Sequence, residues 1–215
     1  MKHIIAYDGL VSVSLGLMQE DYVSEFLPWP NRRIGIEGTR QRPPYSLASG
    51  IEWVRGLDKQ KGSSEVFAIL LHTGTAKKRM YQYVGHMGLH DISWPNGIAK
   101  TGSVIGNSKA RGQGCGTEAK LLLEYHAFMV VGVRKITSEA KVFNGASIGH
   151  LIKCGYKQVG RRRAHHFHEG AYVDEILFEV FREEWEPIWE QYQAIKALPH
   201  LTDAQRALVK EIANA

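Results

Sequence analysis

The residue types best suited to chemistry gather in one glycine-rich stretch of this chain. It reads Arg111-Gly112-Gln113-Gly114-Cys115-Gly116-Thr117. Glycines at alternate positions adopt backbone conformations closed to other residues, and they let main-chain N–H groups approach a ligand. An apolar run typical of a strand, Ile98 to Ile105, precedes the stretch, and an amphipathic run typical of a helix, Glu118 to Val130, follows it. Because the first N–H groups of a helix lack partners within the helix, loop and helix together predict an anion cradle, most often for phosphate.

The spacing within the stretch argues against the two commonest nucleotide-binding loops. A P-loop needs a lysine before its Ser or Thr, whereas Gly116 precedes Thr117 here. The dinucleotide fingerprint is G-x-G-x-x-G, whereas Gly112, Gly114 and Gly116 give G-x-G-x-G. A glycine-rich turn without any ligand stays open as the alternative at this point.

The order of the predicted elements also disfavours a dinucleotide fold, which opens with β-α-β units. Three strand-like runs joined by short turns precede the glycine stretch: Val66 to Leu71, Met80 to Leu89 and Ile98 to Ile105. The other strand-like runs are Leu10 to Leu17, Arg134 to Val142, Tyr156 to Gly160, Ala164 to His168 and Tyr172 to Phe181, and the other helix-like runs are Gln19 to Phe26, Ser46 to Leu57, Ala146 to Lys153, Glu186 to Leu198 and Thr202 to Asn214. We therefore predict a mixed α+β fold with a central, mostly antiparallel sheet flanked by helices.

Several motifs resemble those of the GNAT acetyltransferases, and they occur in the family's order. Arg111-x-x-Gly114-x-Gly116 matches the family's R/Q-x-x-G-x-G/A motif for the pyrophosphate of an acyl-CoA. The segments that resemble the RimJ/RimL branch are Asn144-Gly145-Ala146-Ser147-Ile148, Lys153-Cys154-Gly155-Tyr156, Gly160-Arg161-Arg162, Gly170-Ala171-Tyr172-Val173-Asp174 and Glu184-Trp185. This resemblance implies the acyl-CoA N-acyltransferase fold for residues 1–185 and leaves 186–215 as a C-terminal helical extension.

The resemblance also implies acetyl-CoA as cosubstrate and assigns residues to it. The pyrophosphate would lie on the cradle from Arg111 to Thr117, including Gly112, Gln113, Gly114, Cys115 and Gly116. The pantetheine arm would pair with the strand edge at Ser103, Val104 and Ile105. Asn144 would hydrogen-bond the arm, while Ser147 and Lys153 would lie near the cofactor. The position of Asn144 equally suits a helix N-cap.

Acetyl transfer to an amine needs a deprotonated nucleophile and a proton for the leaving thiolate. An α-ammonium has a pKa near ~8 and an alkylammonium near ~10.4, so an α-amine needs less help from a base. Many relatives place a tyrosine seven residues after the asparagine as the acid, and Leu151 occupies that position here. Following the RimJ/RimL pattern, we expect Ser147 to be the nearest hydroxyl.

Glu139 is the candidate base, since a carboxylate on a central strand could accept the amine proton directly or through water. The alternative for Glu139 is a surface carboxylate paired with Lys141 or Arg134. His86 and His90 are further candidates, although a strand histidine is more often packed or hydrogen-bonded. The glutamate that usually precedes the lysine of the motif is replaced by Ile152.

Composition indicates the number of domains, the expected location of the protein and the state of its cysteines. The chain has 215 residues, 44% of them hydrophobic, which fits a single domain. Its formal net charge of +5 is compatible with nucleic acid, a membrane surface or a polyanionic small molecule as a partner, and charge alone does not choose among them. The chain has no apolar run of ~18 residues and no signal peptide, so we expect it to be cytoplasmic. Cys115 and Cys154 make no disulfide framework and suggest no zinc site, and Cys115 is expected to pack rather than attack.

The densest basic cluster offers two other interpretations. Arg161-Arg162-Arg163 is followed by His165, His166 and His168. Nucleic-acid binding is one alternative, though interleaved aromatic residues are few. His166 and His168 share a strand face that would suit a metal, but we expect no metal because no carboxylate or cysteine completes the set nearby in sequence.

The function predicted from the sequence is transfer of an acetyl group from acetyl-CoA to a primary amine. The acceptor is open among a protein N-terminus, an aminoglycoside, a polyamine and an amino acid, and its determinants should lie in the surface loop from Asn31 to Pro44, expected to be mobile, and in the closing hairpin. A non-catalytic acyl-CoA-binding relative is the alternative that Leu151 and Ile152 favour. The extension either packs on the domain or forms a contact with a partner such as a second copy.

Overall fold

The computed structural model describes residues 3–31, 45–75 and 78–214. The strands are β1 (Ile5–Tyr7), β2 (Val13–Leu17), β3 (Glu65–Thr75), β4 (Lys78–Ser93), β5 (Ile98–Ile105), β6 (Lys135–Lys141), β7 (Lys157–His168) and β8 (Ala171–Phe181). The α-helices are α1 (Val23–Phe26), α3 (Leu47–Gly56), α4 (Cys115–Tyr125), α5 (Gly145–Lys153), α6 (Arg182–Ile195) and α7 (Asp203–Asn214). Short 3₁₀ turns are η1 (Glu20–Tyr22), η2 (Leu57–Gln60) and η3 (Ser108–Ala110), and a π-helix, η4 (His126–Val131), extends α4. The loop predicted from Asn31 to Pro44 lies outside the described residues apart from Asn31.

Eight strands form one sheet in the order β1-β2-β3-β4-β5-β6-β8-β7. Six of the seven neighbouring pairs in this described sheet are antiparallel, and β5 with β6 is the parallel one. The prediction of a mixed α+β fold with a mostly antiparallel sheet is confirmed. After β5 the chain crosses one face of the sheet through α4 and re-enters the sheet as β6. Such a crossover makes β6 parallel to β5.

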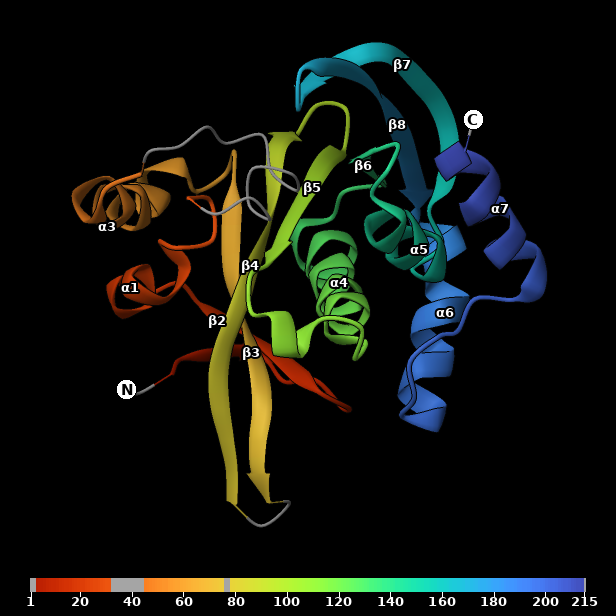
Figure 1. Cartoon of the computed structure of the whole chain (residues 1–215). Helices are drawn as coiled ribbons and strands as arrows, with labels where there is room; N and C mark the ends of the chain where they lie inside the picture. The colour runs from red at the N-terminus through yellow and green to blue at the C-terminus, as the bar shows by residue number, and fades with distance from the viewer. Residues whose placement is uncertain (1–2, 32–44, 76–77, 215) are drawn as a thin grey trace.

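The two faces of the sheet carry different helices. Figure 1 shows α1 and α3 against one face and α4, α5 and α6 against the other. The larger core lies under α4, where Leu121, Leu122 and Phe128 pack on the sheet. A smaller aromatic core lies under α1, around Tyr22 and Tyr83. Consecutive strand residues alternate between these faces, so a ligand on one face meets different side chains from a ligand on the other.

Several element bounds differ from the sequence-based expectations. Strand β1 was not predicted, and α4 begins at Cys115 rather than Glu118 because Gly114, with φ of 83°, already serves as its N-cap. The last turn of that helix widens into a π-helix, which ends at Gly132 as predicted. Strand β7 is continuous where two strands were expected, with an irregularity between Arg162 and His166.

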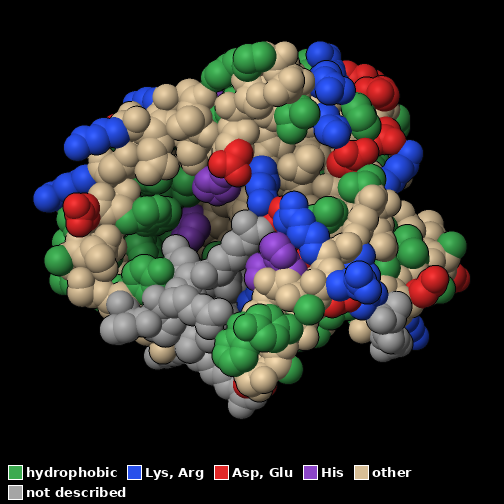
Figure 2. All heavy atoms as spheres, turned by 90° about the horizontal axis from the view of Figure 1, so that it is seen from above, with side chains coloured by type: hydrophobic (Ala, Val, Ile, Leu, Met, Phe, Trp, Pro, Cys, Tyr) green, Lys and Arg blue, Asp and Glu red, His purple; other side chains and the backbone are tan. Residues whose placement is uncertain are grey.

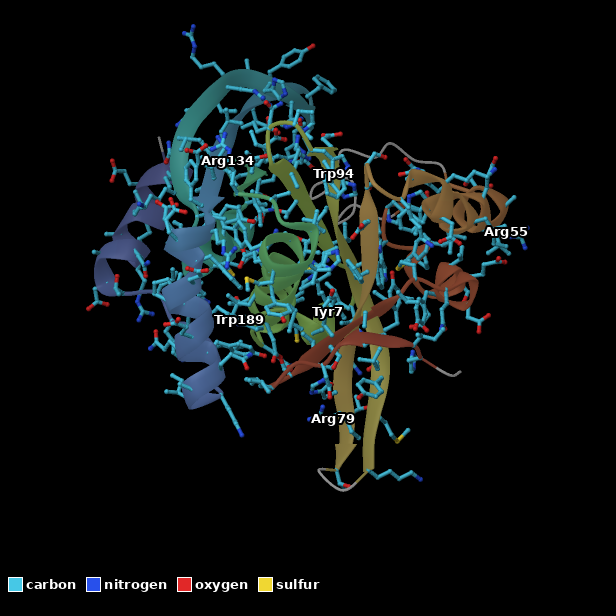
Figure 3. All side chains as sticks on the ribbon, turned by 180° about the vertical axis from the view of Figure 1, so that it is seen from behind. Tyr7, Arg55, Arg79, Trp94, Arg134 and Trp189 are labelled. Carbon is cyan, nitrogen blue, oxygen red and sulfur yellow. The ribbon has the colours of Figure 1, made fainter. Side chains whose placement is uncertain are left out.

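The C-terminal helices pack on the domain. The side chains of Trp185 and Tyr192 on α6 are buried, and Trp189 stacks on Tyr125 of α4 with ring centroids 4.9 Å apart (Figure 3). The predicted capping box at Thr202 forms, since the Gln205 N–H donates to Thr202 Oγ1 at 3.2 Å. A contact between two copies stays a prediction. Among the described residues, no helix is long and apolar enough to cross a membrane.

Candidate active site

The sheet opens between β5 and β6, and this opening organises the site. Ladder pairing between the two strands runs from Ile98 to Lys100 on β5. Farther along, β5 stays paired with β4 through Ser103, Val104 and Ile105. On its other side β6 diverges from these residues. A strand edge that faces such an opening can pair with an extended ligand that carries amides. The strand edge predicted to pair with a pantetheine arm therefore lies where β5 diverges from β6.

The glycine stretch lies directly beyond β5 and opens α4. Gly112 and Gly114 have φ values of 75° and 83°, which favour glycine. A Cβ atom on Gly116 would come within 3.1 Å of Ile105, so glycine lets the helix approach the end of β5 closely. Arg111 Nε donates to the Ile105 carbonyl at 2.9 Å, which ties the loop to the strand edge. The first N–H groups of α4 and its positive dipole end thus face the same region as the strand opening.

A buried carboxylate fixes the first turn of α4. Glu118 has no exposed surface, and its oxygens accept from the backbone N–H groups of Val11, Ser12 and Val13 at 2.7, 2.5 and 2.9 Å. The Tyr192 hydroxyl also donates to Glu118, at 2.6 Å. One carboxylate therefore joins the helix of the cradle to the turn before β2 and to α6. Sequence periodicity alone did not indicate this role.

Helix α5 carries the residues that the resemblance placed near the cofactor. Asn144 is its N-cap, because the side-chain oxygen accepts from the Ser147 N–H at 3.1 Å. Ser147 and Lys153 are both partly exposed. Leu151, at the position of the tyrosine found in many relatives, is buried in the main core. Capping by Asn144 leaves its amide N–H₂ as a donor for a ligand, so the two roles considered for it are compatible.

Glu139 lies in a row of charged side chains across β5, β6, β7 and β8. Its carboxylate accepts from Lys100 Nζ at 2.7 Å and from Arg162 at 3.1 Å, two cations that were not considered from the sequence. The same Arg162 donates to Glu175 at 2.7 Å. The assignment of Glu139 as the base stays a prediction. Any proton transfer to it takes place beside two cations.

Two histidines of β4 border the opening from the face of α1 and α3. Burial, with His90 nearby, lowers the pKa of His86 to about 4, so its ring is neutral at pH 7. The Tyr83 hydroxyl and His86 Nδ1 share a hydrogen bond of 2.9 Å. Burial also lowers the pKa of His90, whose Nδ1 shares a hydrogen bond with Ser64 Oγ at 2.8 Å. Its Nε2 lies 3.5 Å from where a Cβ on Gly102 would stand, beside the strand edge.

The structure corrects the reasoning about the histidine cluster. A nearby carboxylate does exist, because β8 brings Glu175 opposite β7, where its oxygens and the nitrogens of His165 and His166 all lie within 4.8 Å of one another. His166 Nε2 shares a 2.7 Å hydrogen bond with Glu175. The Arg162 guanidinium already pairs with the Glu175 carboxylate, and its positive charge would repel a metal ion at the same place. The expectation of no metal stays a prediction.

Both cysteines are buried. Cys115 lies at the first position of α4 and is 1% exposed, and burial raises the pKa of its thiol. Burial also raises the pKa of Cys154 well above its usual range. These surroundings suit packed thiols rather than nucleophiles.

An aromatic pocket on the face of α1 and α3 was missed by the sequence reasoning. Its lining includes Phe26, Trp29, Tyr45, Trp53, His86 and Val104. Figure 2 shows a hollow bordered by hydrophobic side chains on the side of α3, with histidines at its wall, beside a band of basic, acidic and histidine side chains. Its aromatic residues come from α1, α3 and β4 and from the segments after α1 and before α3, so only the fold brings them together.

The diverging strands and the glycine cradle between them define the acyl-CoA N-acyltransferase fold. Residues 11–157 match the acetyltransferase (GNAT) domain, which covers more than half of the chain. The chain belongs to the GNAT acetyltransferase family.

Solved structures with this fold carry different activities. RimJ from Mycobacterium smegmatis, in complex with CoA-disulfide, has a TM-score of 0.74 and 16% identity over 93% of this chain and 95% of that one. Spermidine N-acetyltransferase from Vibrio cholerae, in complex with CoA and spermine, has a TM-score of 0.69 and 16% identity over 81% and 98%. The microcin C7 self-immunity acetyltransferase MccE, in complex with acetyl-CoA and AMP, has a TM-score of 0.65 and 17% identity over 79% and 92%. At these identities the likeness establishes the fold.

Proposed function

We propose that this protein transfers the acetyl group of acetyl-CoA to a primary amine in a ternary complex, in the manner of the RimJ/RimL branch. The observation that carries the proposal is the glycine cradle, which opens α4 at the point where β5 diverges from β6. Backbone N–H groups of Gly112 to Thr117 and the guanidinium of Arg111 would hold the pyrophosphate. The arm would extend along Ser103, Val104 and Ile105. Asn144 and Lys153 would contact it from α5.

The reaction requires one bond to form and one to break. The amine nitrogen attacks the thioester carbonyl, the new C–N bond forms, the C–S bond breaks, and the sulfur leaves as a thiolate. Glu139 would take the amine proton, directly or through water, and later release it to solvent. Ser147 would pass a proton to the thiolate and take a replacement from solvent water. His90 is the second candidate for the base, since its lowered pKa keeps the ring neutral beside the strand edge.

The acceptor is a protein N-terminus or a small amine. The three relatives named above are a RimJ, a spermidine acetyltransferase and an enzyme solved with AMP, so fold alone does not choose among acceptor classes. A non-catalytic acyl-CoA-binding protein is the second candidate, and buried Leu151 in the place of the usual acid favours it.

Release of free CoA thiol tests the proposal. Acetyl-CoA is mixed with the protein and with a panel of α-amines, polyamines and aminoglycosides, and a thiol reagent follows the release of CoA. The proposal predicts release with at least one amine and loss of most of that rate in the Ser147→Ala and Glu139→Gln variants. Binding of CoA without release from any amine would favour the non-catalytic alternative.

A further inference from the structure

The aromatic pocket lies on the sheet face opposite the phosphate cradle. Phe26 and Trp53 contact the ring of His86 with centroids 5.6 and 5.2 Å away. Trp29 stacks on Tyr83 at 5.4 Å with an angle of 11° between the rings. The pocket floor is formed by His86 of β4 and its register partner Val104 of β5.

The position of the pocket determines which substrate can enter it. The cradle and α4 lie on one face of the sheet, whereas α1 and α3, which carry the aromatic wall, lie on the other (Figure 1). A cofactor held by the cradle, with its arm along Ser103, Val104 and Ile105 as proposed above, would border the pocket at Val104. The room beyond Val104 is therefore available to the molecule that approaches from the face of α1 and α3, which is the acceptor.

The described part of the lining is mostly apolar, with Tyr45, Ser49 and His86 as its polar side chains. It contains no carboxylate and no lysine or arginine among the described residues. The one titratable ring that could become cationic, His86, is neutral at pH 7 because of its burial. An ammonium group seated here would lose its hydration with no described carboxylate to pair with it, and cation–π contact with the rings would offset only part of that cost. Apolar groups lose nothing comparable and gain contact with the rings.

We propose that the acceptor is an amine that carries an apolar side chain, and that this side chain occupies the aromatic pocket. The inference rests on the proposed acetyl transfer. The cavity has a volume of about 100 Å³, and a cavity of roughly 150 Å³ holds benzene. The pocket therefore suits a branched aliphatic group of about four carbons. The polycationic acceptor class is disfavoured.

A close contact between Trp29 and the backbone defines one wall of the pocket. Trp29 lies directly on Gly106, where a Cβ atom would stand 1.7 Å from its ring. Glycine at this position thus lets the indole rest against the backbone just after β5. The indole therefore forms one wall of the pocket, beside the end of β5.

Matched α-amides test the inference, because leucinamide, glycinamide and lysinamide share the nucleophile and differ in the side chain. We expect kcat/KM for leucinamide to exceed that for glycinamide about 30-fold, as burial of one aliphatic side chain predicts. Lysinamide and spermidine should fall below leucinamide. Trp53→Ala should reduce the preference for leucinamide, and Trp53→Glu should shift it toward lysinamide. Trp94→Ala is the control, because Trp94 is 57% exposed at the turn between β4 and β5 (Figure 3).

Binding is also measured without turnover. N-acetyl-leucinamide, which has no free amine, should quench tryptophan fluorescence in the wild type and lose most of this effect in Trp53→Ala. Thermal melts verify that both Trp53 variants fold. A protein that binds acetyl-CoA but prefers spermidine, treats all side chains alike or fails to bind N-acetyl-leucinamide overturns this inference and leaves acetyl transfer intact. A protein that does not bind acetyl-CoA refutes the proposed function instead.

Discussion

Replacement of Glu118 by glutamine should destabilise the protein strongly, although the two side chains have the same shape. Oε2 accepts from Ser12 N, Ser12 Oγ and Val13 N, and Oε1 accepts from Val11 N and the Tyr192 hydroxyl. A glutamine oxygen can keep the three donors at Oε2. Its N–H₂ group then faces Val11 N–H, which loses its acceptor inside the protein.

The magnitude follows from these contacts. One buried N–H without an acceptor costs about 1–3 kcal/mol, and loss of the charge weakens the remaining bonds by about 1 kcal/mol each. We therefore expect Glu118→Gln to lower the free energy of unfolding by at least ~3 kcal/mol. For a chain of this size this corresponds to a fall in Tm of about 6–12 °C. Acetyl-CoA should also bind more weakly, because the first turn of α4 loses its anchor.

Urea titration and thermal melts measure this change. Tyr192→Phe removes one donor to the same carboxylate and also the acceptor of the Leu10 N–H, and should cost about 1–3 kcal/mol. Glu190→Gln makes the same chemical change at an exposed position of α6 and should stay within about 0.5 kcal/mol of the wild type. A loss below about 1 kcal/mol in Glu118→Gln would refute the view that this carboxylate holds the cradle.

Three further predictions concern pH, the base and the C-terminal extension. His86 has its pKa lowered to about 4, so the unfolded chain binds a proton there that the folded one does not. The contribution of His86 to stability should be full above pH 6.5 and fall by up to about 3 kcal/mol toward pH 4. His86→Gln should flatten this part of the urea-derived profile, and an unchanged slope would contradict the burial argument. Glu139→Gln should reduce kcat at least 10-fold while His90→Gln has a smaller effect, and the reverse order in initial-rate measurements would make His90 the base. A chain that ends after Ile195 lacks α7 but keeps Tyr192. In size-exclusion chromatography it should show the same oligomeric state as the full chain if α7 only packs on the domain. A halved apparent mass would indicate that α7 forms a dimer contact.

The glycine cradle and the strand before it were predictable because their signals are local. The bounds predicted for β5 match the structure, and the N-cap of α5 at Asn144 was visible in the sequence. Turn residues and helix caps act over a few positions, so sequence spacing captures them.

The rest of the site depends on contacts between distant segments. The sequence placed no carboxylate near His166, because Glu175 reaches it only through pairing of β7 with β8. The partners of Glu139 come from β5 and β7 for the same reason. The aromatic pocket combines side chains from α1, α3 and β4 that show no pattern in the sequence. The pocket proposed for the acceptor was therefore the part that sequence reasoning could not describe.

Calorimetric titration of acetyl-CoA into the protein tests the central claim most directly. A Cβ atom on Gly112 would meet nothing within 4 Å, and Asn and Asp both tolerate its positive φ, so Gly112→Asn and Gly112→Asp differ mainly in charge at the cradle. We predict one site per chain in the wild type, modest weakening in Gly112→Asn, and at least 10-fold weaker binding in Gly112→Asp because a carboxylate faces the pyrophosphate. No heat of binding at millimolar acetyl-CoA, or equal affinity in all three proteins, would contradict the assignment of this loop to the cofactor.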